Sequence, residues 1–167
     1  LQMSDPELTE DGFMIYVDED FWVNHPLHST IKKYGYFDYE ANEALHLSPK
    51  EEETIWDLFY KIREEYYNNQ DNYSKDIMLG HIESILKYSL RFYNRQFLNR
   101  TVLSGTIISK FTEILNGYFE RGNLQKHGLP TVKYMASKLS LSAGYLSDLL
   151  KQETGRTALD HIHTALI

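Results

Sequence analysis

Apolar positions recur at helical spacing over most of the chain and predict three long helices followed by several short ones. The first is expected to begin at Pro49, because the run Ser48-Pro49-Lys50-Glu51 combines an N-cap serine, a proline at the first helical position and a glutamate placed for a capping box. It should extend to about residue 67. Its buried stripe is predicted to consist of Ile55, Leu58, Phe59, Ile62 and Tyr66.

A second helix is expected from a cap at Ser74 to about Phe97, and it carries the longest apolar stripe in the sequence. The short polar run 68–73 joins it to the first helix, so the two should form an antiparallel hairpin. An apolar face too long for the hairpin to bury is typically covered by a second copy. The pattern therefore predicts a homodimer through the helices at 49–97. A third helix is expected over residues 104–120.

The stretch 131–155 predicts two short helices joined by a tight turn. Thr131 and Ser142 are suitable N-caps, and Gly155 is a suitable helix terminator. Both helices carry an apolar stripe at helical spacing, formed by Val132, Met135, Ala136 and Leu139 and by Tyr145, Leu146, Leu149 and Leu150. This is a helix-turn-helix pattern. Thr157 is expected to cap a final helix over 158–167.

The N-terminal quarter has a different composition. Residues 1–10 are expected to form a loop, and residues 12–23 are dense in aromatic and β-branched residues, which predicts one strand or a short hairpin. Residues 28–38 could form a short helix ended by Gly35, and residues 36–47 a strand and a turn. The expected fold is mainly α: a helical hairpin and bundle with a small β remnant at the N-terminus, followed by a helix-turn-helix unit of homeodomain-like type.

Composition narrows the function classes. The 167-residue chain contains no cysteine, which excludes disulfides, cysteine nucleophiles and thiolate metal sites. No signal peptide or membrane-spanning run is present in the sequence, so a cytoplasmic protein without membrane contact is expected. The net charge is −7, but residues 126–167 carry +2 and the remainder −9. This asymmetry fits a weakly basic nucleic-acid-binding module attached to an acidic body.

The run from Leu139 to Ile162, LSLSAGYLSDLLKQETGRTALDHI, resembles the first helix-turn-helix of AraC/XylS-type bacterial transcription regulators. The resemblance lies in Ser142 with residues 145–147, in the helix end at 151–155 and in the step at 156–158. It implies a dimeric, sequence-specific regulator that binds double-stranded promoter DNA and responds to a small-molecule effector bound upstream of these residues. The effector, the operator and the direction of regulation stay open.

The family layout also implies a domain organisation. Residues 1–47 would be the end of a cupin-like sensor domain, residues 48–122 a helical dimerisation region, and residues 123–167 the first helix-turn-helix with the start of a linker helix. The glycines and proline at 122–130 mark the boundary before this last unit. The resemblance further implies that Leu1 is not the native start and that a second helix-turn-helix follows.

In that family the second helix of the motif lies in the major groove and the first crosses the DNA backbone. The corresponding reading positions are Ala143, Gly144, Ser147, Asp148 and Lys151, with Ser142 and Tyr145 near the backbone and Thr131, Lys133 and Lys138 available for phosphates. Gly144 and Asp148 depart from the pattern. Glycine offers no side chain, and an aspartate, although it can accept from a cytosine amino group, repels phosphate.

Other chemistry receives little support. The histidine pairs 25/28 and 161/163 lack a carboxylate partner motif, and no phosphate-binding glycine loop or nucleophile elbow occurs, so no metal, no cofactor and no enzyme activity are expected. The aromatic residues at 13–22 and 34–39 could line a ligand pocket or pack against the helices, and packing is favoured. The alternative function is a helical protein–protein interaction module whose helix-turn-helix does not read DNA.

Overall fold

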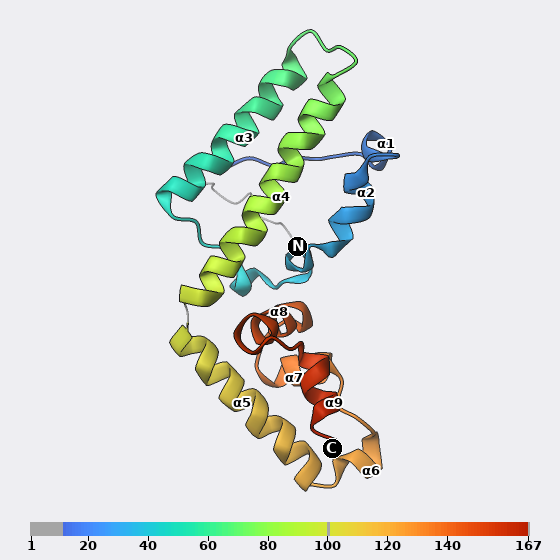
Figure 1. The fold of residues 1–167 in the computed structure, drawn as a ribbon, viewed down its shortest axis with the longest axis vertical. Helices are drawn as coiled ribbons and strands as arrows, with labels where there is room; N and C mark the ends of the chain where they lie inside the picture. The colour runs from blue at the N-terminus through green and yellow to red at the C-terminus, as the bar shows by residue number, and fades with distance from the viewer. Residues whose placement is uncertain (1–11, 100, 167) are drawn as a thin grey trace, which may run out of the picture.

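The computed structural model describes residues 12–99 and 101–166, and in this part of the chain it is helical, with no strand (Figure 1). No helix among these residues is long and apolar enough to cross a membrane. The α-helices are α1 Glu19–Trp22, α2 Pro26–Thr30, α3 Pro49–Tyr67, α4 Ser74–Asn99, α5 Thr101–Glu120, α6 Asn123–His127, α7 Val132–Lys138, α8 Ala143–Thr154 and α9 Ala158–Thr164. Short 3₁₀ segments lie at Ile31–Lys33, Gly35–Asp38 and Ala41–Glu43.

Helices α3 and α4 form the predicted antiparallel hairpin (Figure 1). The capping box at the start of α3 is present, since the Ser48 N–H donates to Glu51 Oε2 over 2.8 Å. Arg95 of α4 donates through Nη2 to Glu51 Oε2 at 2.8 Å, and its Nε forms an ion pair with Oε1 of the same carboxylate at 2.8 Å, which fixes the open end of the hairpin. Hydrogen bonds from Ser48 and Arg95 outweigh the effect of burial and lower the pKa of Glu51.

The core of this half lies between the hairpin and the N-terminal segment. Its buried members are Leu27, Tyr34, Ile62, Met78, Leu79, Ile82 and Leu86. Ile62 is the buried residue of α3, whereas Tyr66 of the predicted stripe is exposed. Tyr60 and Tyr67 are exposed on the same helix. The homodimer through residues 49–97 stays a prediction. Its interface would have to bury the exposed side chains of Tyr60, Tyr66 and Tyr67.

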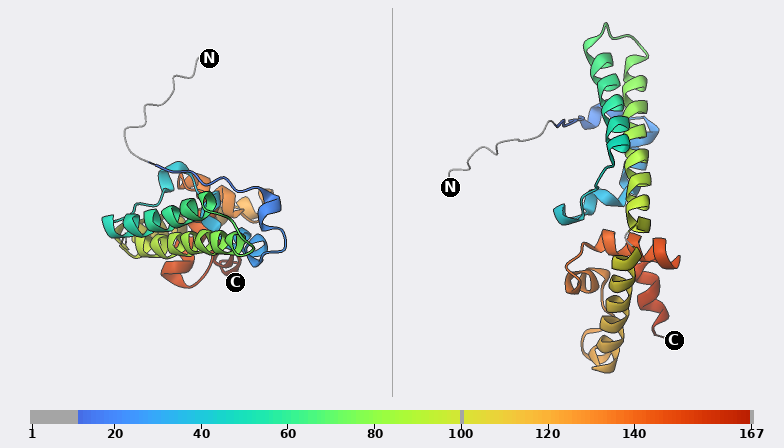
Figure 2. Two further views of the ribbon diagram at one scale, coloured as in Figure 1. Left: turned by 90° about the horizontal axis from the view of Figure 1, so that it is seen from above. Right: turned by 90° about the vertical axis from the view of Figure 1, so that its left-hand side faces the viewer.

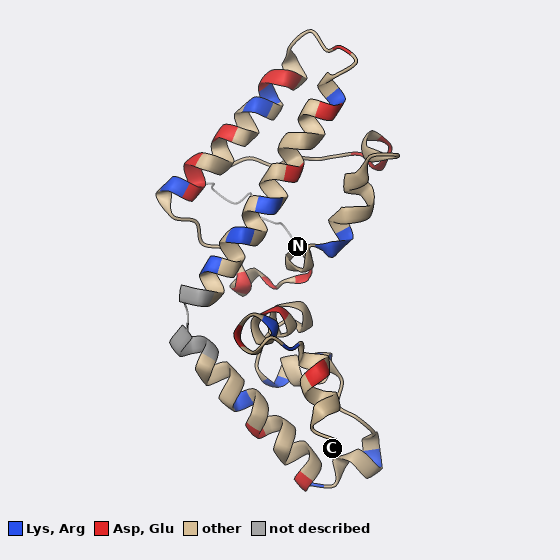
Figure 3. Ribbon diagram, viewed as in Figure 1, with Lys and Arg blue, Asp and Glu red and all other residues tan. Residues whose placement is uncertain are grey.

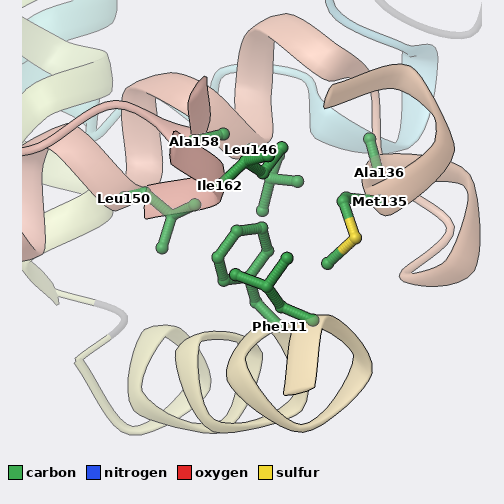
Figure 4. Packing of buried hydrophobic residues seen from close by; sticks show 8 residues of the cluster. Phe111, Met135, Ala136, Leu146, Leu150, Ala158 and Ile162 are labelled. Atoms are coloured by element: carbon green, nitrogen blue, oxygen red, sulfur yellow. The ribbon is translucent and has the colours of Figure 1, made fainter. Parts of the chain in front are cut away.

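Helix α5 forms a second core with the C-terminal helices. Phe111 and Leu115 of α5 lie against Met135, Ala136, Leu146, Leu150, Ala158 and Ile162, contributed by α7, α8 and α9 (Figure 4). Figure 2 shows the same grouping from the side, with these helices lying along α5 and the hairpin extending away from them. The domain boundary at residues 122–123 stays a prediction, but α5 shares its core with the helices beyond that boundary.

The strand or hairpin predicted at residues 12–23 is wrong. Residues 12–17 are extended and alternate between exposed and half-buried positions, but no second strand pairs with them in the described chain. The alternation arises because Phe13, Ile15 and Val17 face the helical hairpin; the Phe13 ring stacks on Phe59 with centroids 4.0 Å apart. Asp18 then accepts from the Asp20 N–H at 2.9 Å and caps α1.

Other predicted bounds changed by smaller amounts. The helix expected at 28–38 begins earlier, at Pro26, and gives way to 3₁₀ turns, while the strand expected within 36–47 is replaced by 3₁₀ segments. The boundary segment predicted at 122–130 contains α6, and the final α-helix, expected over 158–167, ends at Thr164. Helix α5 starts three residues before its predicted start. The loop expected at residues 1–10 lies outside the described residues.

Candidate nucleic-acid interface

Helices α7 and α8 are defined by side-chain caps at the positions that the sequence indicates. The Thr131 hydroxyl accepts from the Tyr134 N–H, and the Ser142 hydroxyl accepts from the Tyr145 N–H, each at 3.1 Å. Such caps satisfy amides that have no intrahelical partner. Ser140 in the turn has a φ of 57° and Gly155 at the end of α8 a φ of 76°, so the chain reverses direction in left-handed conformations at both places.

The inner faces of the two helices are held by the second core. Leu146 and Leu150 of α8 are fully buried against Met135 and Ala136 of α7, with Phe111 of α5 beneath them (Figure 4). Thr157 caps α9 through a reciprocal pair of hydrogen bonds with Asp160. This packing fixes the position of α8 relative to α5, α7 and α9. The opposite face of α8 lies outside this core.

Four of the ten predicted DNA-contacting residues are exposed. They are Thr131, Lys133 and Lys138 at and on α7 and Lys151 in α8. The Lys138 ammonium lies 5.5 Å from the centre of the Tyr134 ring. These side chains are accessible to solvent.

The other predicted contacts are covered. Tyr145 is buried, and the remainder are half-buried: Ser142, Ala143, Gly144, Ser147 and Asp148. The cover over the first turns of α8 is the chain around residues 35–46, which lies beside this helix and carries several acidic positions (Figure 3). The sequence pattern predicted that this segment belongs to the N-terminal sensor region and gave no indication that it packs against α8.

Two hydrogen bonds join that segment to α8. The Ser142 N–H donates to Glu43 Oε1 at 2.7 Å, and the Tyr39 hydroxyl donates to Asp148 Oδ2 at 2.7 Å. Burial, followed by the hydrogen bond to Asp148, raises the pKa of Tyr39. Its hydroxyl therefore remains a proton donor to the carboxylate.

Glycines allow the two backbones to approach closely. A Cβ added to Gly35 would lie 2.8 Å from Asp148 Oδ2, closer than real Cβ contacts. A Cβ added to Gly144 would lie 3.5 Å from both the Gly35 carbonyl oxygen and the Tyr39 ring, in ordinary van der Waals contact. A side chain larger than alanine at Gly144 would meet this segment.

An aromatic cluster continues the contact into the hairpin. The Tyr145 ring centre lies 5.3 Å from that of Tyr39 and 5.1 Å from that of Phe97 in α4, and Tyr93 lies 5.1 Å from Tyr39. These rings form a small core with Leu149. Tyr39 therefore packs between α4 and α8 and Tyr36 stacks on Tyr93 of α4, which agrees with the packing alternative for these two residues, whereas Phe37 is 58% exposed.

An apolar cavity of about 400 Å³ lies between the hairpin and the N-terminal segment. Phe21, Phe59, Ile62 and Met78 are among its lining residues, so part of the N-terminal aromatic group does border a hollow. Whether an effector binds this chain stays a prediction. Within the described residues, no three histidine, aspartate or glutamate side chains are grouped to hold a metal ion.

Two histidines instead serve local structure. His25 Nδ1 accepts from the Leu27 N–H at 3.1 Å and caps α2, and His161 Nε2 lies 2.8 Å from the Thr154 hydroxyl. The candidate site therefore consists of the α7–α8 pair with its exposed lysines and its covered first turn. No family model, curated protein or solved structure matches this chain.

Proposed function

We propose that this chain is a DNA-binding transcription regulator whose α7–α8 unit contacts the duplex. The observation that supports it most is the pair of side-chain-capped helices on a shared core, which leaves lysines exposed on α7 and at Lys151 of α8. The resemblance of residues 139–162 to AraC-type regulators supports the same function. In this arrangement α7 crosses the DNA backbone and α8 is the helix that reads bases.

The two groups of predicted contacts have different roles in this proposal. Lys133 and Lys138 neutralise phosphates, which gives affinity without sequence preference. Ser147 and Asp148 would read base edges, and an aspartate accepts from a cytosine N4 amino group. Lys133 and Lys138 are exposed, whereas Ser147 and Asp148 are half-buried.

Salt dependence tests the phosphate contacts. The logarithm of the affinity for a labelled duplex should fall linearly with the logarithm of the salt concentration, and Lys133→Ala and Lys138→Ala should each reduce that slope by about one. Fluorescence anisotropy at several salt concentrations measures the slope. Lys61→Ala removes an exposed lysine from α3 and should leave it unchanged. Equal slopes in all four proteins, or no duplex binding at low salt, would contradict the proposal.

The second candidate is a protein-interaction module in which α8 only packs. The covered first turn of α8 favours it, because a helix whose polar residues bond within the chain needs no nucleic acid to satisfy them. The same titration separates the two candidates. A packing helix predicts no dependence of duplex binding on the lysines of α7, whereas a DNA-binding unit predicts the reduced slopes.

A further inference from the structure

The contact between residues 35–43 and α8 has the form of a closed latch. Its two hydrogen bonds, Tyr39 to Asp148 and Ser142 to Glu43, join residues 109 and 99 positions apart, and they lie on the side of α8 that the proposed function assigns to DNA. Both bonds involve a carboxylate. Hydrogen bonds to ionised groups are roughly twice as strong as neutral ones.

Glu43 lies at the N-terminus of α8, a position that favours an anion. The N-terminus of a helix presents free amides and a partial positive charge, and it binds anions for both reasons. Here the Glu43 carboxylate accepts the Ser142 N–H through Oε1 and the Glu40 N–H through Oε2 at 2.8 Å. Glu43 is 2% exposed. Its carboxylate is thus held in one orientation, with one oxygen directed at the start of α8.

Tyr39 and Gly35 cover the next turn. The Tyr39 hydroxyl bonds to Asp148, and the backbone of Gly35 approaches the same carboxylate so closely that a methyl group would collide with it. Gly144 and Asp148 are the two residues that depart from the pattern of AraC-type regulators. Both have a partner within this chain: Gly144 faces Gly35 and Tyr39, and Asp148 accepts from Tyr39.

The covering segment is anchored to the hairpin. The Gln96 side chain of α4 accepts the His46 N–H at 2.8 Å and donates to the Ala44 carbonyl at 3.2 Å. Arg95 donates to the His46 carbonyl at 2.8 Å. The major groove is about 12 Å wide and admits one helix. The anchored segment lies against the first turns of α8, the part of the helix that would have to enter this groove.

We propose that residues 35–43 are an autoinhibitory latch, which holds the DNA-reading face of α8 closed until the segment moves away. The inference rests on the proposed function, since it gives that function its regulation. The protein then exists in closed and open forms, and its apparent affinity for DNA is the affinity of the open form multiplied by the open fraction. Any change that weakens the latch increases duplex binding without adding a DNA contact.

Tyr39→Phe tests the latch in the full chain, because it removes the bond to Asp148 and keeps the ring. Amide hydrogen exchange at Ser142, whose N–H is held by Glu43, should accelerate about tenfold. Binding of a random-sequence duplex should tighten by a similar factor. Tyr66→Phe is the control: it removes a hydroxyl from an exposed tyrosine of α3, outside residues 35–43 and outside α8. It should change neither measurement.

Gly35→Ala opens the latch in a second way, by steric collision with Asp148 instead of loss of a polar group. It should accelerate exchange and tighten binding like Tyr39→Phe, and circular dichroism confirms that each variant is folded. Unchanged exchange at Ser142 in both variants overturns the latch. If exchange at Ser142 becomes faster while duplex binding is unchanged and still depends on Lys133 and Lys138, the segment does not inhibit DNA binding. The proposed function is unaffected by that result. Faster exchange with no duplex binding by any variant overturns the proposed function, and the inference with it.

Discussion

Phe111→Ala is expected to lower the free energy of unfolding by about 3–5 kcal/mol, because it removes an aromatic side chain from a filled core. Phe111 is 1% exposed and lies where α5 meets α7, α8 and α9. The cavity would open beneath Leu146 and Leu150, the residues that hold α8 in place. Urea unfolding followed by circular dichroism measures the change.

A substitution in the same unit provides the control. Leu159→Ala in α9 truncates a side chain that is 49% exposed, and it should alter the free energy of unfolding by no more than about 0.5 kcal/mol. Phe111→Leu retains most of the volume and should cost less than Phe111→Ala. If Phe111→Ala and Leu159→Ala cost the same, the α5–α9 core does not have the packing described.

Leu79→Ala is expected to have the second large effect, a loss of about 3–5 kcal/mol from the stability of the helical hairpin. Leu79 is fully buried in α4 and belongs to the core with Leu27 and Ile62. That core joins α3 and α4 to the N-terminal segment and shares no buried residue with the core around Phe111. The same urea titration measures the loss.

The matched control for Leu79 lies on the same helix. Leu90 is 41% exposed, so Leu90→Ala should cost about 1 kcal/mol or less. Tryptophan fluorescence adds a local measurement, since Trp22 and Trp56 lie in the hairpin half. Leu79→Ala should lower the urea concentration at the midpoint of the fluorescence transition. A midpoint equal to that of the unaltered protein would contradict the two-core arrangement.

The sequence predicted the helices where local chemistry defines them. Ser48, Thr131, Ser142 and Thr157 are caps whose hydrogen bonds involve neighbouring residues, so a short window contains the information needed. Apolar spacing then predicted which side of α8 is buried, and Leu146, Leu149 and Leu150 are buried as expected. Nothing distant is required for either inference.

The strand prediction for the N-terminal segment was wrong because a local pattern does not show what covers an extended chain. Alternation of apolar residues at 12–17 is the signature of an extended chain with one side covered, and it does not specify whether strands or helices provide the cover. Here helices do, through contacts such as Phe13 on Phe59. The apolar alternation does predict which side chains face the helices. A sheet would also need a second strand as a hydrogen-bonding partner, and the alternation alone does not indicate whether one exists.

The cover over α8 could not be found by local reasoning, because Tyr39 and Asp148 are far apart in the chain. A weak signal was nevertheless present. Gly144 and Asp148 fit poorly on a surface that approaches phosphates, and both fit well against a second segment of protein. Residues that suit a function poorly at one position are therefore a reason to look for a competing partner within the same chain.

We infer that α8 reads DNA when it is uncovered. Selection of bound duplexes from a randomised pool by the Tyr39→Phe chain tests this inference most directly, since the open form should be more populated in that variant. Enrichment of a defined sequence is expected, and Ser147→Ala should weaken it, because this change removes a side chain that the proposed function assigns to base reading. Recovery of a pool with no enriched sequence would contradict the inference.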